Sequence, residues 1–276
     1  MISLAFEEVL QAFAKMEELY PRVLPLTVWR AWEYAAYKHF HLPKAPVLDL
    51  GCGDGQFFHL VWGEQFPAVD GVDLDERAVR LARGSGVYRQ VFHAPADRIP
   101  APEAAYGAVF SNCALEHMDN INGVLAETYR VILPGGVFLF SAVTDRLVAW
   151  APLKQLLSAV GEARRGEELW GLYEEYHHLV NPLPQEEWVA RLQSVGFEVQ
   201  TVIPIVPEVF ARAFLFFDEL WHVRYAEGEL GPYIHRYLGT LPNFTDGVSK
   251  VLEGLWRLSP NLSEGAGVIV LARKRE

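Results

Sequence analysis

The sequence predicts an α/β fold built on a doubly wound parallel sheet. Strand-like runs alternate with helical patterns as far as residue 143, a glycine-rich turn follows the first run, and an acidic residue ends the second. Such alternation is typical of βαβ units with helices on both faces of a sheet. With 276 residues, 51% of them hydrophobic, the chain is long enough for this core and a large helical addition.

The elements follow one another in a clear order. Residues 1–45 have the pattern of two or three helices, interrupted by prolines. Period and composition then predict strands at residues 46–51, 68–74, 87–94, 105–112, 136–143, 196–204 and 267–272.

Two helices between these strands carry their own boundary signals. The first is expected at 75–86, with Asp75 as the capping acid and glycines at its end. The second is expected at 121–136, where Pro134, Gly135 and Gly136 stop it. The crossovers that these helices make are expected to be right-handed.

Beyond residue 143 the connections become longer than a sheet requires. Residues 205–260 are rich in aromatic side chains, most of which we expect to pack as the core of a helical cap, with some lining an apolar pocket. The sequence therefore divides into a helical lid (1–45), a sheet core (46–145), a helical insertion with the sixth strand (146–204), an aromatic-rich helical cap (205–264) and a last strand (265–276).

The charge of the chain argues against a nucleic-acid partner. The net charge is −11, and no basic run exceeds Arg164-Arg165 or the triplet 273–275. No apolar run is long enough to span a membrane, and the amphipathic N-terminus has no secretory pattern. The two cysteines, Cys52 and Cys113, are expected to stay reduced in a cytoplasmic setting.

The stretch VLDLGCGDGQF, residues 47–57, indicates a ligand with a positive end. A dinucleotide site would show G-x-G-x-x-G, but Gln56 stands at the third glycine position. Asp49 and Asp54 flank the glycines, and two carboxylates repel a pyrophosphate while they attract an ammonium or sulfonium. Asp73 ends the second strand, 22 residues after Gly51, at the spacing typical of an acid that binds ribose hydroxyls.

With these features the sequence resembles the class I S-adenosylmethionine-dependent methyltransferases. The resemblance rests on VLDLGCGDG, VDGVDLDE, AAYGAVFSNCALEHM and RVILPGG, covers 46 to about 143 closely, and extends through QEEWVARLQSVGFEV. It implies a Rossmann-like seven-stranded sheet whose last strand, GVIVLARK, is antiparallel and lies beside the fifth. It also implies S-adenosylmethionine as the cofactor.

The resemblance assigns cofactor contacts along three strand ends. The residues it places around the methionine part, the ribose, the adenine and the sulfonium are Asp49, Gly51, Cys52, Gly53, Asp73, Leu74, Asn112 and Cys113. One position departs from the family, because Pro95 stands where relatives often carry an adenine-binding aspartate. Ala96, through its backbone, and Asp97 are the residues left for that contact.

Three histidines are candidates for catalysis. His177 and His178 are adjacent, and neighbouring side chains point in different directions, so no metal site is expected there. A histidine with a pKa near neutrality can act as the base for a hydroxyl acceptor. The resemblance implies that His117 lies near the pocket mouth. Methyl transfer needs mainly in-line placement, so the base is optional.

The resemblance implies methyl transfer to a small molecule through oxygen, nitrogen or carbon, and by analogy includes glycan- or lipid-linked acceptors. Two alternatives stay open. The same core serves a protein that binds the cofactor without catalysis, and it serves an aminopropyl transferase, which requires an acidic pocket. The acceptor and the oligomeric state are left open by the sequence.

Overall fold

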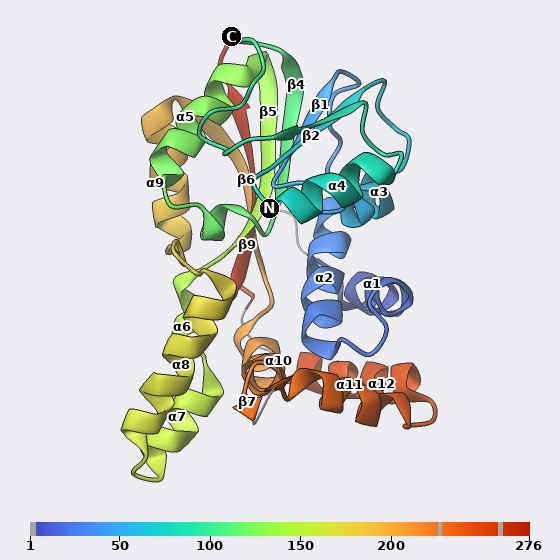
Figure 1. Cartoon of the computed structure of the whole chain (residues 1–276), viewed down its shortest axis with the longest axis vertical. Helices are drawn as coiled ribbons and strands as arrows, with labels where there is room; N and C mark the ends of the chain where they lie inside the picture. Colours follow the sequence, from blue (N-terminus) through green and yellow to red (C-terminus); the bar gives the residue numbers. More distant parts are fainter. Residues whose placement is uncertain (1–3, 226–227, 259–261) are drawn as a thin grey trace.

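The structure is a computed structural model that describes residues 4–225, 228–258 and 262–276. The other eight positions, which belong to the lid and cap segments defined above, lie outside the described residues. Within these ranges a seven-stranded sheet has the order β3-β2-β1-β4-β5-β9-β6 (Figure 1). Its strands are β1 (Val47–Leu50), β2 (Val69–Asp73), β3 (Gln90–His93), β4 (Tyr106–Asn112), β5 (Ile132–Val143), β6 (Phe197–Ile205) and β9 (Gly267–Lys274).

The strand directions confirm the predicted topology. Strands β1 to β5 pair in parallel, and β9 lies antiparallel between β5 and β6. The seven predicted strands therefore all form, and the last one is antiparallel beside the fifth. A separate short hairpin joins β7 (Arg224–Tyr225) to β8 (Gly228–Glu229).

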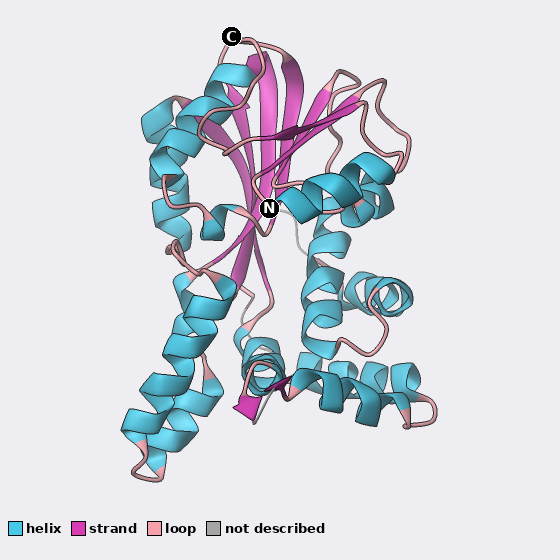
Figure 2. Cartoon of the chain, viewed as in Figure 1, coloured by secondary structure: helices cyan, strands magenta, loops and turns pink. Residues whose placement is uncertain are grey.

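Helices cover both faces of the sheet (Figure 2). Alternate residues of β4 show the two faces: Ala108 and Phe110 face the side of α3, and Val109 faces the side of α5 and α9. Burial on both faces explains why these strands are almost continuously apolar. The helices that flank the strands are α3 (Gln56–Trp62), α4 (Glu76–Gly84), α5 (Ile121–Val131) and α9 (Gln185–Val195).

One predicted boundary is wrong. The helix expected at 121–136 ends at Val131, and β5 continues through the Pro-Gly-Gly stretch. Ile132 pairs with Tyr106 of β4, so the chain enters the sheet earlier than the sequence indicates. The ammonium of Lys274 donates to the carbonyls of Tyr129 (2.7 Å) and Ile132 (2.9 Å). These hydrogen bonds satisfy carbonyl groups at the end of α5, where no further turn of the helix supplies N–H donors.

The remaining helices gather beyond the carboxyl ends of the parallel strands (Figure 1). Helix α10 lies at their centre and packs against α2, α7 and α12. The group consists of α1 (Phe6–Leu19), α2 (Leu24–Tyr37), α6 (Asp145–Ala149), α7 (Pro152–Ala159), α8 (Ala163–His177), α10 (Glu208–Trp221), α11 (Gly231–Gly239) and α12 (Phe244–Arg257).

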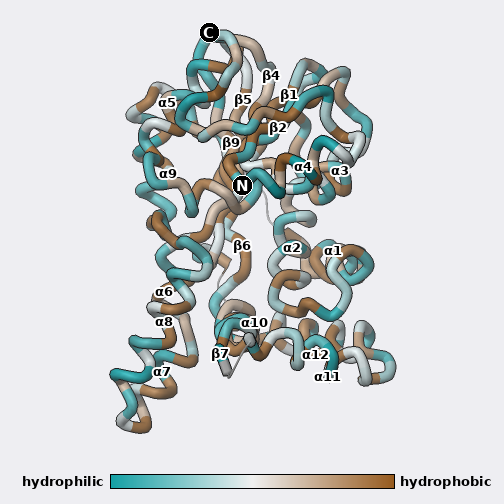
Figure 3. Tube along the Cα trace, in the orientation of Figure 1, coloured by the Kyte–Doolittle hydropathy of each residue, from teal (hydrophilic) through white to brown (hydrophobic). Residues whose placement is uncertain are grey.

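Aromatic side chains join the N-terminal helices to the cap. Trp32 of α2 lies 5.3 Å from Phe210 of α10 and 6.2 Å from Trp256 of α12, between ring centroids. Trp32 and Phe210 are fully buried, as expected for aromatic residues that form a core. Along the helices hydrophobic and hydrophilic residues alternate, as in amphipathic elements (Figure 3). No helix among the described residues is long and apolar enough to cross a membrane.

Candidate functional site

The glycine loop between β1 and α3 is packed at both ends and open in its middle. Gly51, Gly53 and Gly55 all have positive φ, at +72°, +55° and +82°. A Cβ on Gly51 would come within 2.5 Å of Cβ of Ala114, and one on Gly55 within 2.6 Å of the Tyr88 ring. At Gly53 nothing lies within 4 Å, so a ligand can approach the backbone closely there. These positions fit a bound cofactor.

Asp73 ties the end of β2 to this loop. Its carboxylate accepts hydrogen bonds from the backbone N–H groups of Gly53 and Asp75, each at 2.9 Å. Asp75 is the N-cap of α4 and accepts from the N–H of Ala78 at 2.7 Å, which confirms the predicted cap. Leu74, between the two acids, is 68% exposed and offers an apolar surface beside the loop.

Asp49 is buried beneath the loop, with 3% of its surface exposed. The hydroxyl of Tyr88 donates to its Oδ2 at 2.5 Å. Burial raises the pKa of Asp49 to about 7, against the effect of this hydrogen bond and helped by the charge of Asp73. A carboxyl of this kind gains its charge most readily when a cation binds beside it.

Three of the expected cofactor residues have other surroundings. The thiol of Cys52 packs in a small apolar cluster with Val79 of α4, so it is the backbone of Cys52 that belongs to the loop. Asp97 accepts a hydrogen bond at 2.8 Å from the amide of Asn120, the N-cap of α5. Ala96 packs against the apolar cluster on the same face of the sheet as α5.

A buried polar network fixes α2 to the ends of β4 and β5. Glu33 of α2 is fully buried and pairs with the guanidinium of Arg30 at 2.6 Å. It also accepts from the hydroxyl of Ser141 (2.7 Å), the thiol of Cys113 (3.1 Å) and the amide of Asn112 (3.3 Å). Burial and the charge of Glu33 raise the pKa of the Cys113 thiol, which therefore stays protonated and donates. Asn112 and Cys113 thus lie together at the carboxyl end of β4.

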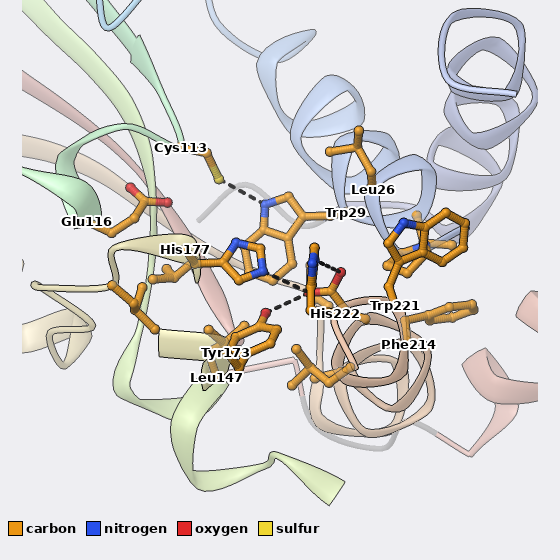
Figure 4. A pocket seen from close by; sticks show the side chains of 18 of the residues that line it. Leu26, Trp29, Cys113, Glu116, Leu147, Tyr173, His177, Phe214, Trp221 and His222 are labelled. Carbon is orange, nitrogen blue, oxygen red and sulfur yellow. Dashed lines mark hydrogen bonds and ion pairs between the residues drawn. The ribbon is translucent and has the colours of Figure 1, made fainter. Parts of the chain in front are cut away.

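A cavity of about 370 Å³ opens beyond this network, between α2, the segment after β4, α8 and α10 (Figure 4). At one end the indole N–H of Trp29 donates to the sulfur of Cys113 at 3.1 Å. Glu116 lines the wall there, and one of its buried oxygens has no partner among the described residues. The other walls are largely apolar and include Leu26, Leu147, Phe214 and Trp221.

The far end of the cavity is polar. Tyr173 donates from its hydroxyl to Asp218 at 2.6 Å, and His177 and His222 each have a ring nitrogen 3.9 Å from that carboxylate (Figure 4). Burial lowers the pKa of His177 to about 4 and lowers that of His222 as well. Both imidazoles are therefore neutral at pH 7, while burial raises the pKa of Asp218.

The three predicted histidines separate in space. His177 and His117 line the cavity. His178 lies outside its lining: this residue ends α8 with φ at +46°, and its ring faces Asp119 at 3.1 Å on the surface, 62% exposed. His178 is therefore not part of the cavity that His177 and His117 line.

Several residues of the cavity and of the buried network beside it were not expected from the sequence. Asp218 and His222 are four residues apart on FFDELWH, a spacing that places them on one helix face and was the only signal available. Glu33 could have been noticed as an acid inside an apolar helix pattern.

The glycine loop lies in a part of the chain that is similar to known proteins. Residues 48–140 match the family described as a methyltransferase domain. A malonyl-(acyl-carrier protein) O-methyltransferase of Serratia marcescens is 34% identical over 101 residues, which cover 37% of this chain and 39% of that protein. The protein of the same name from Erwinia billingiae is 30% identical over 154 residues, covering 53% and 60%.

The alignments therefore span between two fifths and three fifths of these relatives. Among solved structures, an S-adenosylmethionine-dependent methyltransferase from Thermotoga maritima matches with a TM-score of 0.58 and 18% identity. The match covers 97% of this chain and 100% of that one. At this identity the likeness shows the fold alone.

Proposed function

The core of this chain, residues 48–140, belongs to the class I S-adenosylmethionine-dependent methyltransferases, and on this premise we propose that the chain methylates a small molecule held in the cavity under its cap. The position of the cavity carries the proposal. Cys113 lines it, and the next residue, Ala114, lies against Gly51 of the glycine loop. A cofactor on the loop and an acceptor in the cavity would share this wall.

The residues on the loop side suit the cofactor's charge and hydroxyl groups. S-adenosylmethionine supplies an electrophilic methyl group on a positively charged sulfur. Asp49 and the open backbone at Gly53 would hold the end that carries the ammonium, and Asp73 would accept hydrogen bonds from the ribose. A binding-only protein would not require a cavity of about 370 Å³ beside this site.

The cavity's own chemistry favours a neutral acceptor with a hydroxyl group. Its walls are largely apolar, and its polar end carries Asp218, so an acceptor carboxylate at that end would meet a like charge. The malonyl group in the relatives' name is such a carboxylate, and we therefore propose a hydroxyl nucleophile in its place.

His177 would accept a hydrogen bond from that hydroxyl, because its imidazole is neutral at pH 7. With a pKa of about 4 it is a weak base. Placement of the acceptor and exclusion of water therefore supply most of the rate, as methyl transfer permits. His117, at the cavity wall, would contact the acceptor.

A screen of acceptors tests the proposed acceptor class. Release of S-adenosylhomocysteine is expected with apolar hydroxylated acceptors and not with carboxylic acids or amines of the same shape.

Filling the cavity tests whether the acceptor binds there. Leu26→Trp places an indole in the cavity and should reduce turnover by at least about tenfold while cofactor affinity is unchanged, since productive placement is lost. Leu156→Trp, on the exposed face of α7, is the matched control and should turn over normally. Normal turnover by Leu26→Trp, or release with carboxylic acids alone, would contradict the proposal.

Removing the ribose acid tests the cofactor side. Asp73→Ala is expected to weaken cofactor binding by about 1.5–3 kcal/mol, because charged hydrogen bonds to the ribose are lost. Asp75→Ala is the control: it removes the cap of α4, which costs stability of about 1 kcal/mol, but leaves the binding carboxylate in place. Titration calorimetry compares the two, and equal affinity for wild type and Asp73→Ala would exclude Asp73 from the site.

A further inference from the structure

We propose that His177, Asp218 and His222 form a binding site for a divalent metal ion of the zinc class at the polar end of the cavity. The sequence indicated no metal, because it showed only the adjacent pair His177 and His178. The fold replaces that pair with a different set, in which two residues of the α10 end approach the end of α8.

The ligand atoms are close enough to bind one ion. One ligand atom from each of the three side chains lies within 4.8 Å of the other two. The Nε2 atoms of His177 and His222 are each 3.9 Å from an oxygen of Asp218. Zinc bonds of about 2.0–2.2 Å set tetrahedral ligand atoms about 3.4 Å apart, so modest side-chain rotations complete the geometry.

Two nitrogens in this cluster are buried without a hydrogen-bond partner among the described residues. They are Nε2 of His177 and Nδ1 of His222, and the His222 side chain is only 10% exposed. Buried polar atoms in folded proteins nearly always have a partner. A metal ion bound by Nε2 of both histidines would provide one for His177 and would leave Nδ1 of His222 as an N–H donor.

That donor has an acceptor nearby. Glu229 of β8 places Oε2 3.7 Å from Nδ1 of His222. A carboxylate behind the second nitrogen of a ligating histidine is the usual outer arrangement of metal sites, because it fixes the tautomer and the ring orientation. Tyr173 orients the carboxylate of Asp218 in a comparable way, since its hydroxyl donates to Oδ2 at 2.6 Å. The cluster therefore has supporting residues as well as ligands.

The donor set selects the kind of ion. Two imidazoles and one carboxylate suit zinc, cobalt or ferrous iron, whereas magnesium and calcium prefer oxygen ligands alone. Three protein ligands leave a coordination position open, and these side chains line the cavity (Figure 4). A hydroxyl acceptor bound to the ion would ionise more readily. With the ion bound, this contact would replace the hydrogen bond from the hydroxyl to His177. The preference against carboxylates then applies to the metal-free chain, because a bound cation would attract them. The role toward an acceptor rests on the proposed function, whereas metal binding itself does not.

Direct titration tests the site on the full chain. After treatment with a chelator and its removal, the protein is titrated with Zn²⁺ by calorimetry, and one equivalent is expected to bind at micromolar or tighter affinity. Co²⁺ is expected to give the visible absorption of a nitrogen- and oxygen-ligated ion. His222→Ala and Asp218→Ala should each weaken Zn²⁺ binding at least a hundredfold, and Glu229→Gln about tenfold to a hundredfold.

His178→Asn is the matched control, because asparagine tolerates the positive φ at this position and the ring of His178 faces the surface. It should bind Zn²⁺ as wild type does. In case a variant fails to fold, imidazole ¹⁵N resonances of the wild-type chain provide a second measurement: Zn²⁺ should shift those of His177 and His222 and not that of His178. Absence of binding, or binding that shifts other histidines instead, overturns the site whether or not an acceptor is ever found.

Discussion

Asp49→Asn is expected to stabilise the cofactor-free protein and nearly to abolish cofactor binding. Burial raises the pKa of Asp49 from 3.8 to about 7, so the folded chain holds a proton that the unfolded chain releases above about pH 4. The free energy of unfolding that this group contributes therefore decreases as the pH rises from about 4 to about 7, and is constant above. Asparagine does not ionise, so the free energy of unfolding of the variant should not decrease with pH in this way.

At about 1.4 kcal/mol for each pH unit between the two pKa values, the gain reaches at most about 4 kcal/mol, and we expect about 2–4 kcal/mol above pH 7. At pH 4 the variant and wild type should differ little. Urea unfolding of both proteins at pH 4 and pH 8 measures this. A difference that is the same at both pH values would show that Asp49 does not carry the raised pKa.

The loss of binding in the same variant has an electrostatic cause. The cofactor's ammonium would lose the carboxylate beneath the loop, and we expect its affinity to fall at least a hundredfold, about 3 kcal/mol. In wild type the affinity should rise between pH 6 and pH 8 as Asp49 ionises, and the variant should lose this dependence. Asp54→Asn is the control. Asp54 is only partly buried and accepts hydrogen bonds from Gln56, so it should attract the ammonium less than Asp49 does, and the variant should retain most of the affinity.

Glu33→Ala is expected to destabilise the fold by about 3–5 kcal/mol, because it leaves a largely buried guanidinium without its partner. Arg30 would lose its 2.6 Å ion pair and the Cys113 thiol would lose its acceptor, while Ser141 would be left with its longer hydrogen bond to Asn112 (3.2 Å). Denaturant unfolding measures the loss. It should also free α2 from the ends of β4 and β5, which exposes the wall between loop and cavity.

Two further variants separate the buried charge from simple loss of packing. Glu17→Ala removes the partner of Arg22, whose side chain is 31% exposed and can turn to water, so its cost should be clearly smaller. The double variant Arg30→Leu, Glu33→Leu removes both charges and should recover much of the stability lost by Glu33→Ala. If the double variant is less stable than Glu33→Ala, the uncompensated charge is not the cause.

The cofactor side of the site was accessible to sequence reasoning because its signals are local. The glycines need positive φ within one turn, Asp73 ends a strand of clear period, and Asp75 caps the helix that follows. Local signals gave the wrong boundary at residues 132–136. The Pro-Gly-Gly stretch indicated that the helix ends there, but the pairing of Ile132 with β4 shows that the strand has already begun.

The acceptor side was not accessible, because its residues come from elements far apart in the chain. His177 ends α8, and Asp218 and His222 lie 41 and 45 positions later at the end of α10. Nothing in the spacing indicates that these two helix ends meet. Their meeting depends on how the cap packs on α2 through Trp32 and Phe210.

By itself, then, the sequence determined the parallel sheet, its antiparallel last strand and a loop suited to a cationic cofactor, because period, turn chemistry and charge act between near neighbours. Only the tertiary structure decided which of two adjacent histidines faces the cavity. The positive φ of His178 turns one ring to the surface, while burial against Tyr173 keeps the other inside. The tertiary structure also brought Glu33 to the ends of the strands and Asp218 close to His177. A buried charged side chain needs polar partners, and only the packing of distant elements supplies them.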